Sequence, residues 1–330
     1  MRKLSVFLLI IVSLSACKQN EKLPVYITGE AQGTYYAITY YDDQMRNFRE
    51  EIDSIFRSFD LSASVYVRES VISRFNRNDS SVRADQVFET IFTKAQEVSD
   101  RTGGAFDITV MPLVNAWGFG FKKKDNVTPA LIDSLLPLIG YQKVRLEHGK
   151  LIKQDTSMMI DYNAIAQGYT SDLIGDFLES KGLKDYLVDV GGEVLGKGEK
   201  PDGSHWKVGI EKPAKDSVSP REIELAVELK NKALATSGSY RKYYLKGGQK
   251  YSHTIDPATG YPVQHSVLSV SVLANDCMTA DAYATAFMVM GLEKTKAFIT
   301  NQKELEVYII YDDRGELKSW SSDGFKSLIR

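Results

Sequence analysis

The sequence predicts a mixed α/β or α+β protein that folds as a single body with intertwined subregions. Stretches rich in β-branched and aromatic residues alternate with stretches whose apolar residues recur at helical spacing. No tract rich in Pro, Gly and Ser divides the chain, and no repeat of fixed period is present. The 43% of hydrophobic and 25% of charged side chains are typical of a globular protein.

The elements of the first half follow from these periodicities. Val87, Ile91, Ala95 and Val98 share one helical face, and Gly103-Gly104 supplies an end for that helix. The expected elements are, in order, a strand over 34–41, helices over 43–59 and 84–101, a charged loop over 122–128 and a short helix over 129–138.

Strands dominate the second half after one long helix. Apolar residues at helical spacing predict that helix from Asn163 to about Ser180. Gly247-Gly248 fits the turn of a hairpin. The other expected elements are strands over 158–162, 186–190, 206–211, 223–229, 240–245, 250–255, 267–273 and 305–311, and helices over 279–290 and 293–302.

The N-terminus has the features of an export signal. Basic residues precede the apolar stretch Leu4–Leu14, which is too short for a stable membrane span. The stretch ends in Leu14-Ser-Ala-Cys17, which resembles a bacterial lipobox; the alternative is an ordinary signal peptide with a chance cysteine. We expect a signal peptide over 1–16, lipidated Cys17 with a tether to residue 24, and a domain over 25–330 outside the cytoplasmic membrane.

Charge and cysteine content argue against nucleic-acid-binding proteins, zinc fingers and disulfide-bonded proteins. The net charge is −2 and the strongest basic run, Lys122–Lys124, is short, which disfavours nucleic-acid binding. Two cysteines and four scattered histidines do not form a zinc-finger pattern. With Cys17 lipidated, Cys277 has no disulfide partner, and we expect a buried structural thiol.

Asp281 and Thr285 form a candidate metal pair. Side chains four residues apart share a helix face, so a carboxylate and a hydroxyl here can reach one hard cation such as Mg²⁺. The alternative is that Asp281 favours a helix N-terminus and Thr285 bonds back to a carbonyl.

Three other segments hold polar residues among apolar ones. In Met158–Tyr169 a strand runs into a helix start with small residues, which suits either phosphate binding or close helix packing. In Gly103–Gly120, aromatic residues beside small ones suit stacking on a planar ring, or a core strand with a satisfied Asp107. His253 precedes an Asp-Pro turn and can accept a proton from a hydroxyl, although a lone histidine is usually structural.

At these residues the chain resembles the ApbE family of flavin transferases, over nearly all of the expected mature chain. The resemblance rests on several motifs in order. They are Gly33-Thr-Tyr35, Tyr66-x3-Ser70-x3-Arg74-Phe-Asn76, Gly104–Phe119, Asp161-x5-Ala166-Gln-Gly-Tyr-x2-Asp172, Val190-Gly-Gly-Glu193, Thr236-Ser-Gly-Ser-Tyr-Arg241, Ser252-His-Thr-Ile-Asp-Pro-x-Thr-Gly260 and Ala280-Asp-Ala-x-Ala-Thr285.

The resemblance implies an ApbE-like fold and a Mg²⁺-dependent transfer of the FMN half of FAD to a Thr or Ser of a partner protein, with release of AMP. It implies that Asp281, Thr285 and the carbonyl of Ala164 bind the metal, and that His253 lies close to the reacting phosphate. It also implies a set of FAD contacts: Gln32, Tyr66, Ala105, Phe106, Asp107, Asp161, Gln167 and Ile255.

Two positions depart from the family pattern. Gln167 stands where the family often has Lys or another charged residue, and Gln32 replaces a common Met, so FAD binding loses a charge at position 167. The resemblance points to a bacterial lipoprotein that flavinylates membrane redox subunits through a Ser/Thr-Gly-x-Thr-like motif. The alternatives are FAD hydrolysis to FMN and AMP at the same site, and FAD binding without catalysis.

Overall fold

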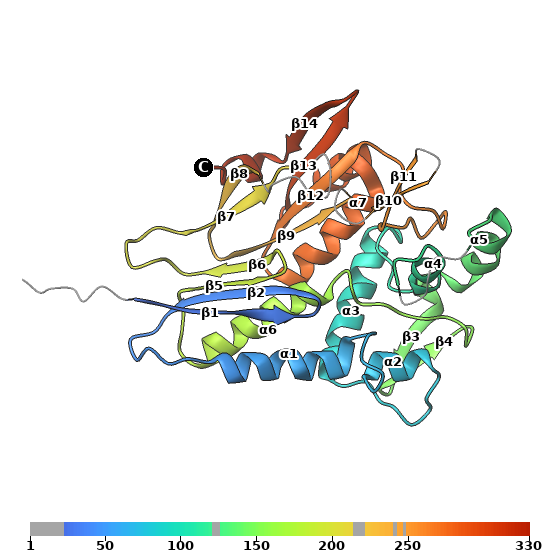
Figure 1. Ribbon diagram of the computed structural model, residues 1–330, viewed down its shortest axis with the longest axis horizontal. Coiled ribbons are helices and arrows are strands. Elements are labelled where there is room, and N and C mark those ends of the chain that lie inside the picture. The colour runs from blue at the N-terminus through green and yellow to red at the C-terminus, as the bar shows by residue number, and fades with distance from the viewer. Residues whose placement is uncertain (1–22, 121–125, 214–221, 240–242, 247–248) are drawn as a thin grey trace, which may run out of the picture.

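A computed structural model describes residues 23–120, 126–213, 222–239, 243–246 and 249–330. Within these residues, eight antiparallel strands form one sheet, which is covered by helices on one face and by a two-stranded ribbon on the other (Figure 1). Its strand order is β1 (Pro24–Ala31), β2 (Thr34–Tyr41), β5 (Tyr186–Val190), β6 (Glu193–Lys197), β9 (Lys232–Gly238), β12 (Val267–Ala274), β13 (Glu306–Asp313) and β14 (Glu316–Ser321).

Helices α1 (Arg49–Ala63), α6 (Ala166–Ser180) and α7 (Cys277–Ile299) cover one face of the sheet. Helix α6 packs on β5 and β6, α7 packs on β9 and β12, and α3 (Gln86–Arg101) packs against α1 and α7. Apolar side chains of the strands and helices are fully buried between these layers, as at Ile38 and Ile174. This burial supplies the main favourable free energy for holding α6 and α7 on the sheet.

The opposite face is covered by the ribbon β7 (Trp206–Glu211) and β8 (Ile223–Leu229) with the short helix α8 (Asp323–Lys326). Trp206 is buried here, and its indole Nε1 donates a hydrogen bond to the carbonyl of Lys197 over 2.7 Å.

Smaller elements gather at one end of the molecule, on the right of Figure 1. The chain enters this end after α1, leaves it at α6 and returns to it at β10 and β11, so the two regions are intertwined in one body, as the sequence predicts. The elements are α2 (Val71–Asn76), α4 (Met111–Ala116), α5 (Pro129–Leu135), the 3₁₀ turns η1 (Leu136–Leu138) and η2 (Tyr141–Lys143), β3 (Val144–Glu147), β4 (Lys150–Lys153), β10 (Tyr243–Lys246) and β11 (Gln249–Ser252).

Most expected elements are confirmed, including the interruption between the last two helices, where Gly291 has φ 75° and ψ −180° inside α7. The strand expected over 158–162 is wrong. That segment is extended, but its backbone is satisfied outside any ladder: Ile160 N donates to the Asn76 side chain and Asp161 N donates to the carbonyl of Ile108. Buried backbone groups need partners, and here side chains and a loop supply them.

Two boundaries also differ. The helix expected over 43–59 begins at Arg49 and extends to Ala63, because Asp42 accepts hydrogen bonds from the backbone of Gln44 and Arg46 and holds a turn there. The strand expected over 250–255 ends at Ser252. The expected hairpin turn Gly247-Gly248, residues 240–242 of an expected strand and residues 122–125 of the charged loop lie outside the described residues.

The first strand begins at Pro24, one residue before the start of the domain expected over 25–330. Cys277 is fully buried, as expected for a structural thiol. None of the helices in the described part of the chain has the length and apolar character that a membrane span requires.

Candidate functional site

The N-terminal turn of α6 meets α7 at Gly168. The Gly168 N–H donates a hydrogen bond to Oδ2 of Asp281 over 3.1 Å. A Cβ at position 168 would lie 2.5 Å from the carbonyl oxygen of Cys277 and 2.8 Å from Cβ of Asp281. The two backbones therefore approach too closely for any residue but glycine.

Asp281 and Thr285 lie one turn apart on α7, as the sequence predicts. Asp281 is 7% exposed, and this burial raises the pKa of its carboxyl to about 7, although the Gly168 amide opposes the shift. The Thr285 Oγ1 lies 3.2 Å from the Ser237 Oγ on β9. The face of α7 that carries the pair is thus enclosed by α6 and by the sheet.

These residues fit a hard cation. Ala164 lies in the turn that immediately precedes α6, close in sequence to the Gly168 amide that binds Asp281. A buried carboxylate is costly unless hydrogen bonds or a cation compensate it. Carboxylate, hydroxyl and carbonyl oxygens are the ligands that Mg²⁺ accepts. The part of the chain that the structure describes holds no group of three or more His, Cys, Asp or Glu that could bind a metal ion, so the Asp281 site has one carboxylate.

Two glutamines flank the start of α6. Gln32 occupies the β1–β2 turn with φ 51°, and its Nε2 donates to Oγ1 of Thr170 over 2.8 Å. Gln167 lies beside the β5–β6 turn, with its Nε2 3.3 Å from where a Cβ on Gly191 would be. The structure therefore brings both departures from the family pattern to the N-terminus of α6, where backbone amides favour anions.

Tyr66 and Asp161 lie together on the other side of this helix start. Burial raises the pKa of the Asp161 carboxyl to about 6, and the Asn163 N–H, 2.7 Å from its Oδ1, opposes the shift. Burial and then the Asp161 carboxylate raise the pKa of the Tyr66 hydroxyl. The Tyr66 side chain as a whole is nevertheless 65% exposed, so its ring offers an open aromatic surface beside a carboxylate.

Asp107 is the polar residue of the segment 105–107, and its hydrogen bonds involve neighbouring turn residues. Asp107 accepts hydrogen bonds from both the N–H and the hydroxyl of Thr109 and from the N–H of Tyr141. Phe106 is buried in the core. The interpretation of Asp107 as a satisfied structural carboxylate fits this geometry, and Ala105 and the main chain remain for contact with a ligand.

His253 directly follows β11, and its ring centre lies 6.4 Å from that of Phe119, edge to face. The turn after His253 is tied to the same segment, because Trp117 Nε1 donates to the carbonyl of Gly260 over 2.8 Å. Ile255 is buried in the cluster between them. The structure thus joins the Gly104–Phe119 and Ser252–Gly260 motifs.

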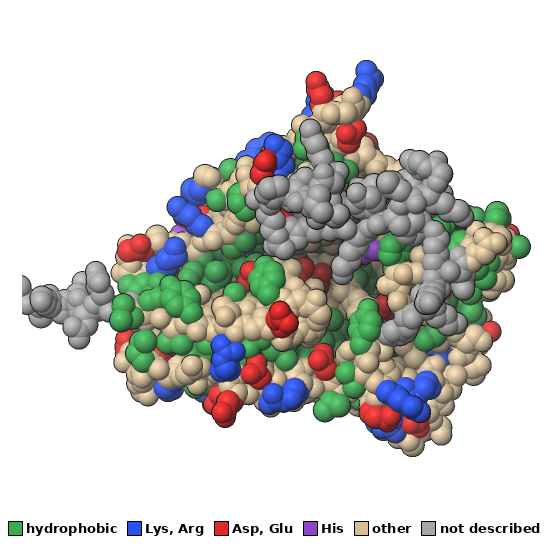
Figure 2. Space-filling model, viewed as in Figure 1, with side chains coloured by type: hydrophobic (Ala, Val, Ile, Leu, Met, Phe, Trp, Pro, Cys, Tyr) green, Lys and Arg blue, Asp and Glu red, His purple; other side chains and the backbone are tan. Residues whose placement is uncertain are grey.

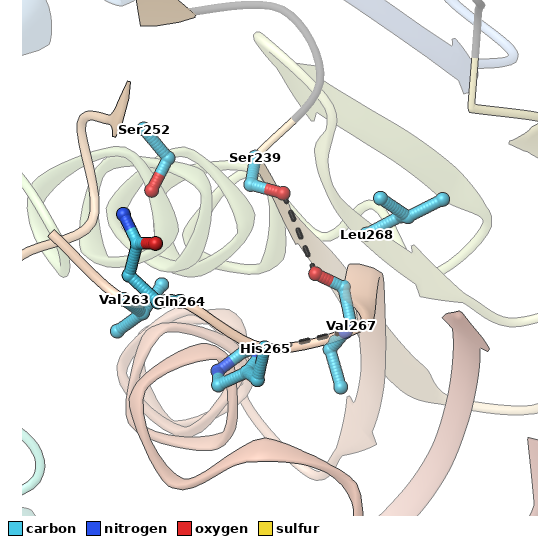
Figure 3. Close-up of a pocket in the computed structure, with 7 residues that line it drawn as sticks. All are labelled: Ser239, Ser252, Val263, Gln264, His265, Val267 and Leu268. Atoms are coloured by element: carbon cyan, nitrogen blue, oxygen red, sulfur yellow. Dashed lines mark hydrogen bonds between the residues drawn. The ribbon is translucent and has the colours of Figure 1, made fainter. Parts of the chain in front are cut away.

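A pocket of about 380 Å³ lies between the end of β9 and the segment after His253. Figure 3 shows Ser239, which directly follows β9, and Ser252, next to His253, above His265 in the view. Ser239 lies two residues beyond Ser237, whose hydroxyl contacts that of Thr285. Acidic side chains gather around a hollow near the middle of the face in Figure 2.

Sequence reasoning assigned no role to Ser237 or Asp172, although it quoted the motifs that contain both. The contact of Ser237 with Thr285 spans 48 residues, and that of Asp172 with Cys277 spans 105. The periodicity of a short segment cannot predict contacts between residues so far apart in the sequence. Only the side-chain types and the motifs that contain these residues could have pointed to them.

Comparisons with known proteins identify the family. The model of the ApbE family matches residues 32–309. The curated FAD:protein FMN transferases of Vibrio cholerae and Haemophilus influenzae are 35% and 33% identical to the chain, which they cover to 100% and 96%; the chain covers 99% and 94% of them. The flavin transferase ApbE structure from Vibrio cholerae aligns with a TM-score of 0.82 over 93% of this chain and 99% of that one, at 35% identity. The apo flavinyl transferase of Pseudomonas stutzeri gives 0.84 over 93% and 97%, at 29% identity.

Proposed function

The chain belongs to the ApbE family, and from this premise we propose that it is an FAD:protein FMN transferase. The hydroxyl oxygen of an acceptor Ser or Thr attacks the phosphorus on the FMN side of the FAD pyrophosphate. The bond from that phosphorus to the AMP oxygen breaks, AMP leaves, and a phosphoester joins FMN to the acceptor. Such transfers depend mainly on positioning and on neutralising charge.

The observation that carries this proposal is the buried Asp281 carboxylate against the N-terminus of α6, with Thr285 one turn further along the same helix. Asp281, Thr285 and the carbonyl of Ala164 would hold Mg²⁺, which when bound neutralises charge on the phosphates. The positive end of the α6 dipole would attract the same phosphates.

The isoalloxazine and ribityl parts of FAD would occupy the surface around Tyr66. The exposed ring stacks on the flavin, and Asp161 accepts hydrogen bonds beside it. Gln32, Gln167, Ile255 and the run Ala105–Asp107 complete the surroundings. Because Gln167 carries no charge, the amides of α6 would carry more of the phosphate contact in this protein.

His253 would accept the proton of the attacking hydroxyl. A neutral imidazole can do so near pH 7. It follows the strand whose end borders the pocket of Figure 3, and that pocket is the place for the acceptor segment.

The export signal supports a location. With Cys17 lipidated, the domain would be anchored to the cell membrane and face the periplasm of a bacterium. Its acceptors would then be membrane redox subunits with a Ser/Thr-Gly-x-Thr-like motif exposed on that side.

The test is mass spectrometry of an acceptor peptide with this motif after incubation with the protein, FAD and Mg²⁺. The expected product is the peptide with one added FMN, and Asp281→Ala should abolish it while the fold is retained. FMN and AMP released at full rate without acceptor would instead establish hydrolysis. Bound FAD that stays intact with Mg²⁺ and acceptor would establish a binding protein, and either result would overturn the proposal.

A further inference from the structure

We propose that Asp172 is a positioning residue that sets the register between α6 and α7, and thereby places Asp281 and Thr285 against the start of α6. The inference rests on the proposed function only in taking Asp281 and Thr285 as ligands of Mg²⁺. Its structural content is independent of which reaction occurs there.

Asp172 caps the N-terminus of a helix other than its own. Its Oδ1 accepts a hydrogen bond from the N–H of Cys277 over 2.7 Å, and its Oδ2 accepts one from the N–H of Met278 over 2.8 Å. Asp172 belongs to α6, and the two amides are the first two of α7. Both oxygens of one carboxylate are thus used to hold the adjacent helix.

The second contact between these helices runs in the opposite sense. Asp281, on α7, accepts from the N–H of Gly168 in the first turn of α6. Gly168 and Asp172 are four residues apart on α6, and Cys277 and Asp281 are four apart on α7. One face of each helix therefore meets the other in antiparallel fashion, and each N-terminus receives a carboxylate from its neighbour.

This arrangement explains why a half-buried acid is tolerated at position 172. Burial raises the pKa of the Asp172 carboxyl to about 7, while the amides of Cys277 and Met278 oppose that shift. An acceptor is needed there because the first amides of a helix have no partner within it. A carboxylate also complements the positive end of the helix dipole.

The register between α6 and α7 matters because their backbones are already in close contact at Gly168. A displacement of α7 along α6 would press the Cys277 carbonyl or Cβ of Asp281 into the Gly168 backbone, or would open the hydrogen bond to Asp281. Asp172, one turn further along α6, prevents that displacement because it holds the first two amides of α7. Removing its carboxylate should therefore misplace the Asp281 carboxylate without touching any group that would bind the metal.

The chain offers a matched control in Asp276, the N-cap residue of α7. Its Oδ1 accepts from the Thr279 N–H over 2.8 Å, so it caps the same helix but does so from within α7. Asp172→Ala and Asp276→Ala each remove one carboxylate cap from α7. Only Asp172→Ala removes the connection to α6.

The experiment measures Mg²⁺ affinity by calorimetry in the wild-type protein, Asp172→Ala, Asp172→Asn and Asp276→Ala, with circular dichroism as the check on folding. We expect affinity to fall on the order of tenfold or more in Asp172→Ala, as for the loss of a group that orients metal ligands. It should fall by less in Asp172→Asn, whose single amide oxygen keeps one of the two bonds, and by under about threefold in Asp276→Ala.

Equal affinity losses in Asp172→Ala and Asp276→Ala would overturn the inference, as would unchanged affinity in folded Asp172→Ala. If Asp172→Ala does not fold, the comparison of Asp172→Asn with Asp276→Asn decides in the same way. FMN transfer by the wild-type protein is scored separately. A wild-type protein that binds Mg²⁺ but transfers nothing would contradict the proposed function and leave the positioning role standing.

Discussion

The Ser237 and Thr285 hydroxyl oxygens lie 3.2 Å apart, where β9 of the sheet meets the face of α7 that we propose binds Mg²⁺. A hydroxyl that binds a cation through its oxygen must direct its proton elsewhere, and Ser237 is placed to accept it. The sheet therefore controls the orientation of a side chain that the helix carries. This gives the Thr236–Arg241 motif a physical role at the site.

Ser237→Ala should weaken Mg²⁺ binding about fivefold, since one hydrogen bond is worth about 1 kcal/mol. Thr236→Ala is the control, because Thr236 pairs with Ser271 at 2.8 Å and points to the other face of the strand. Magnesium titrations of FMN transfer and of thermal unfolding measure the effect. Equal shifts in the two variants would refute a specific role for Ser237.

Gly168→Ala should both destabilise the protein and abolish Mg²⁺ binding. The new Cβ meets backbone and Cβ atoms that cannot rotate away, and overpacking of this kind costs about 1 to 3 kcal/mol. Gly175→Ala, in the same helix, is the comparison, because its Cβ would meet only the side chains of Leu195 and Tyr186. Thermal unfolding with and without Mg²⁺ separates the two effects.

If Gly175→Ala lost the Mg²⁺-dependent gain in melting temperature as completely as Gly168→Ala, general destabilisation would account for both. Retention of that gain in Gly175→Ala alone would assign the loss to the α6–α7 contact at Gly168.

The helical spacing of Asp281 and Thr285 could be predicted because it is local. Two residues that are four positions apart on a helix lie on the same face. The interruption at Gly291 was equally visible in the sequence. The strand of residues 24–31 was missed for the opposite reason. Its pairing with β2 depends on the turn at Gln32 and Gly33, and both have positive φ, which the side chain of Gln32 gave no cause to expect.

The enclosing contacts of the site could not be predicted from the sequence. Asp172 was quoted within a motif, but its partners lie 105 and 106 residues away on another helix. The extended segment 158–162 was misassigned because its strand-like composition reports burial, and burial does not require a ladder. The family resemblance supplied the candidate residues, and the fold supplies what holds them.

The stability of the metal-free protein should fall as the pH rises from about 4 to about 7. Burial raises the pKa values of Asp172 and Asp161 to about 7 and about 6, above the ordinary value of 3.8. Between those limits the folded protein holds protons that the unfolded chain has released, so raising the pH favours unfolding. Thermal unfolding at several pH values measures the slope, and Asp172→Asn should flatten it near pH 7.

Carboxyls with lowered pKa values do not disturb this window. Asp79 is an example, with its pKa lowered to about 2 by hydrogen bonds from Ser81 and Arg74, and it contributes only at more acidic pH. A stability that rises between about pH 4 and about pH 7 in the metal-free protein would contradict the raised pKa values of Asp172 and Asp161.

Tyr66→Ala should weaken FAD binding by about 1 kcal/mol, or about fivefold, because it removes the exposed ring proposed to stack on the flavin. Tyr66→Phe keeps the ring and should bind FAD within about twofold of the wild-type protein. Neither change should alter folding stability by more than about 0.5 kcal/mol, since the side chain is 65% exposed. Quenching of flavin fluorescence gives the affinities.

Tyr26→Ala, which removes a tyrosine that is 68% exposed on β1, controls for the loss of any surface ring. Equal losses in Tyr66→Phe and Tyr66→Ala would assign the contact to the hydroxyl beside Asp161 instead of the ring.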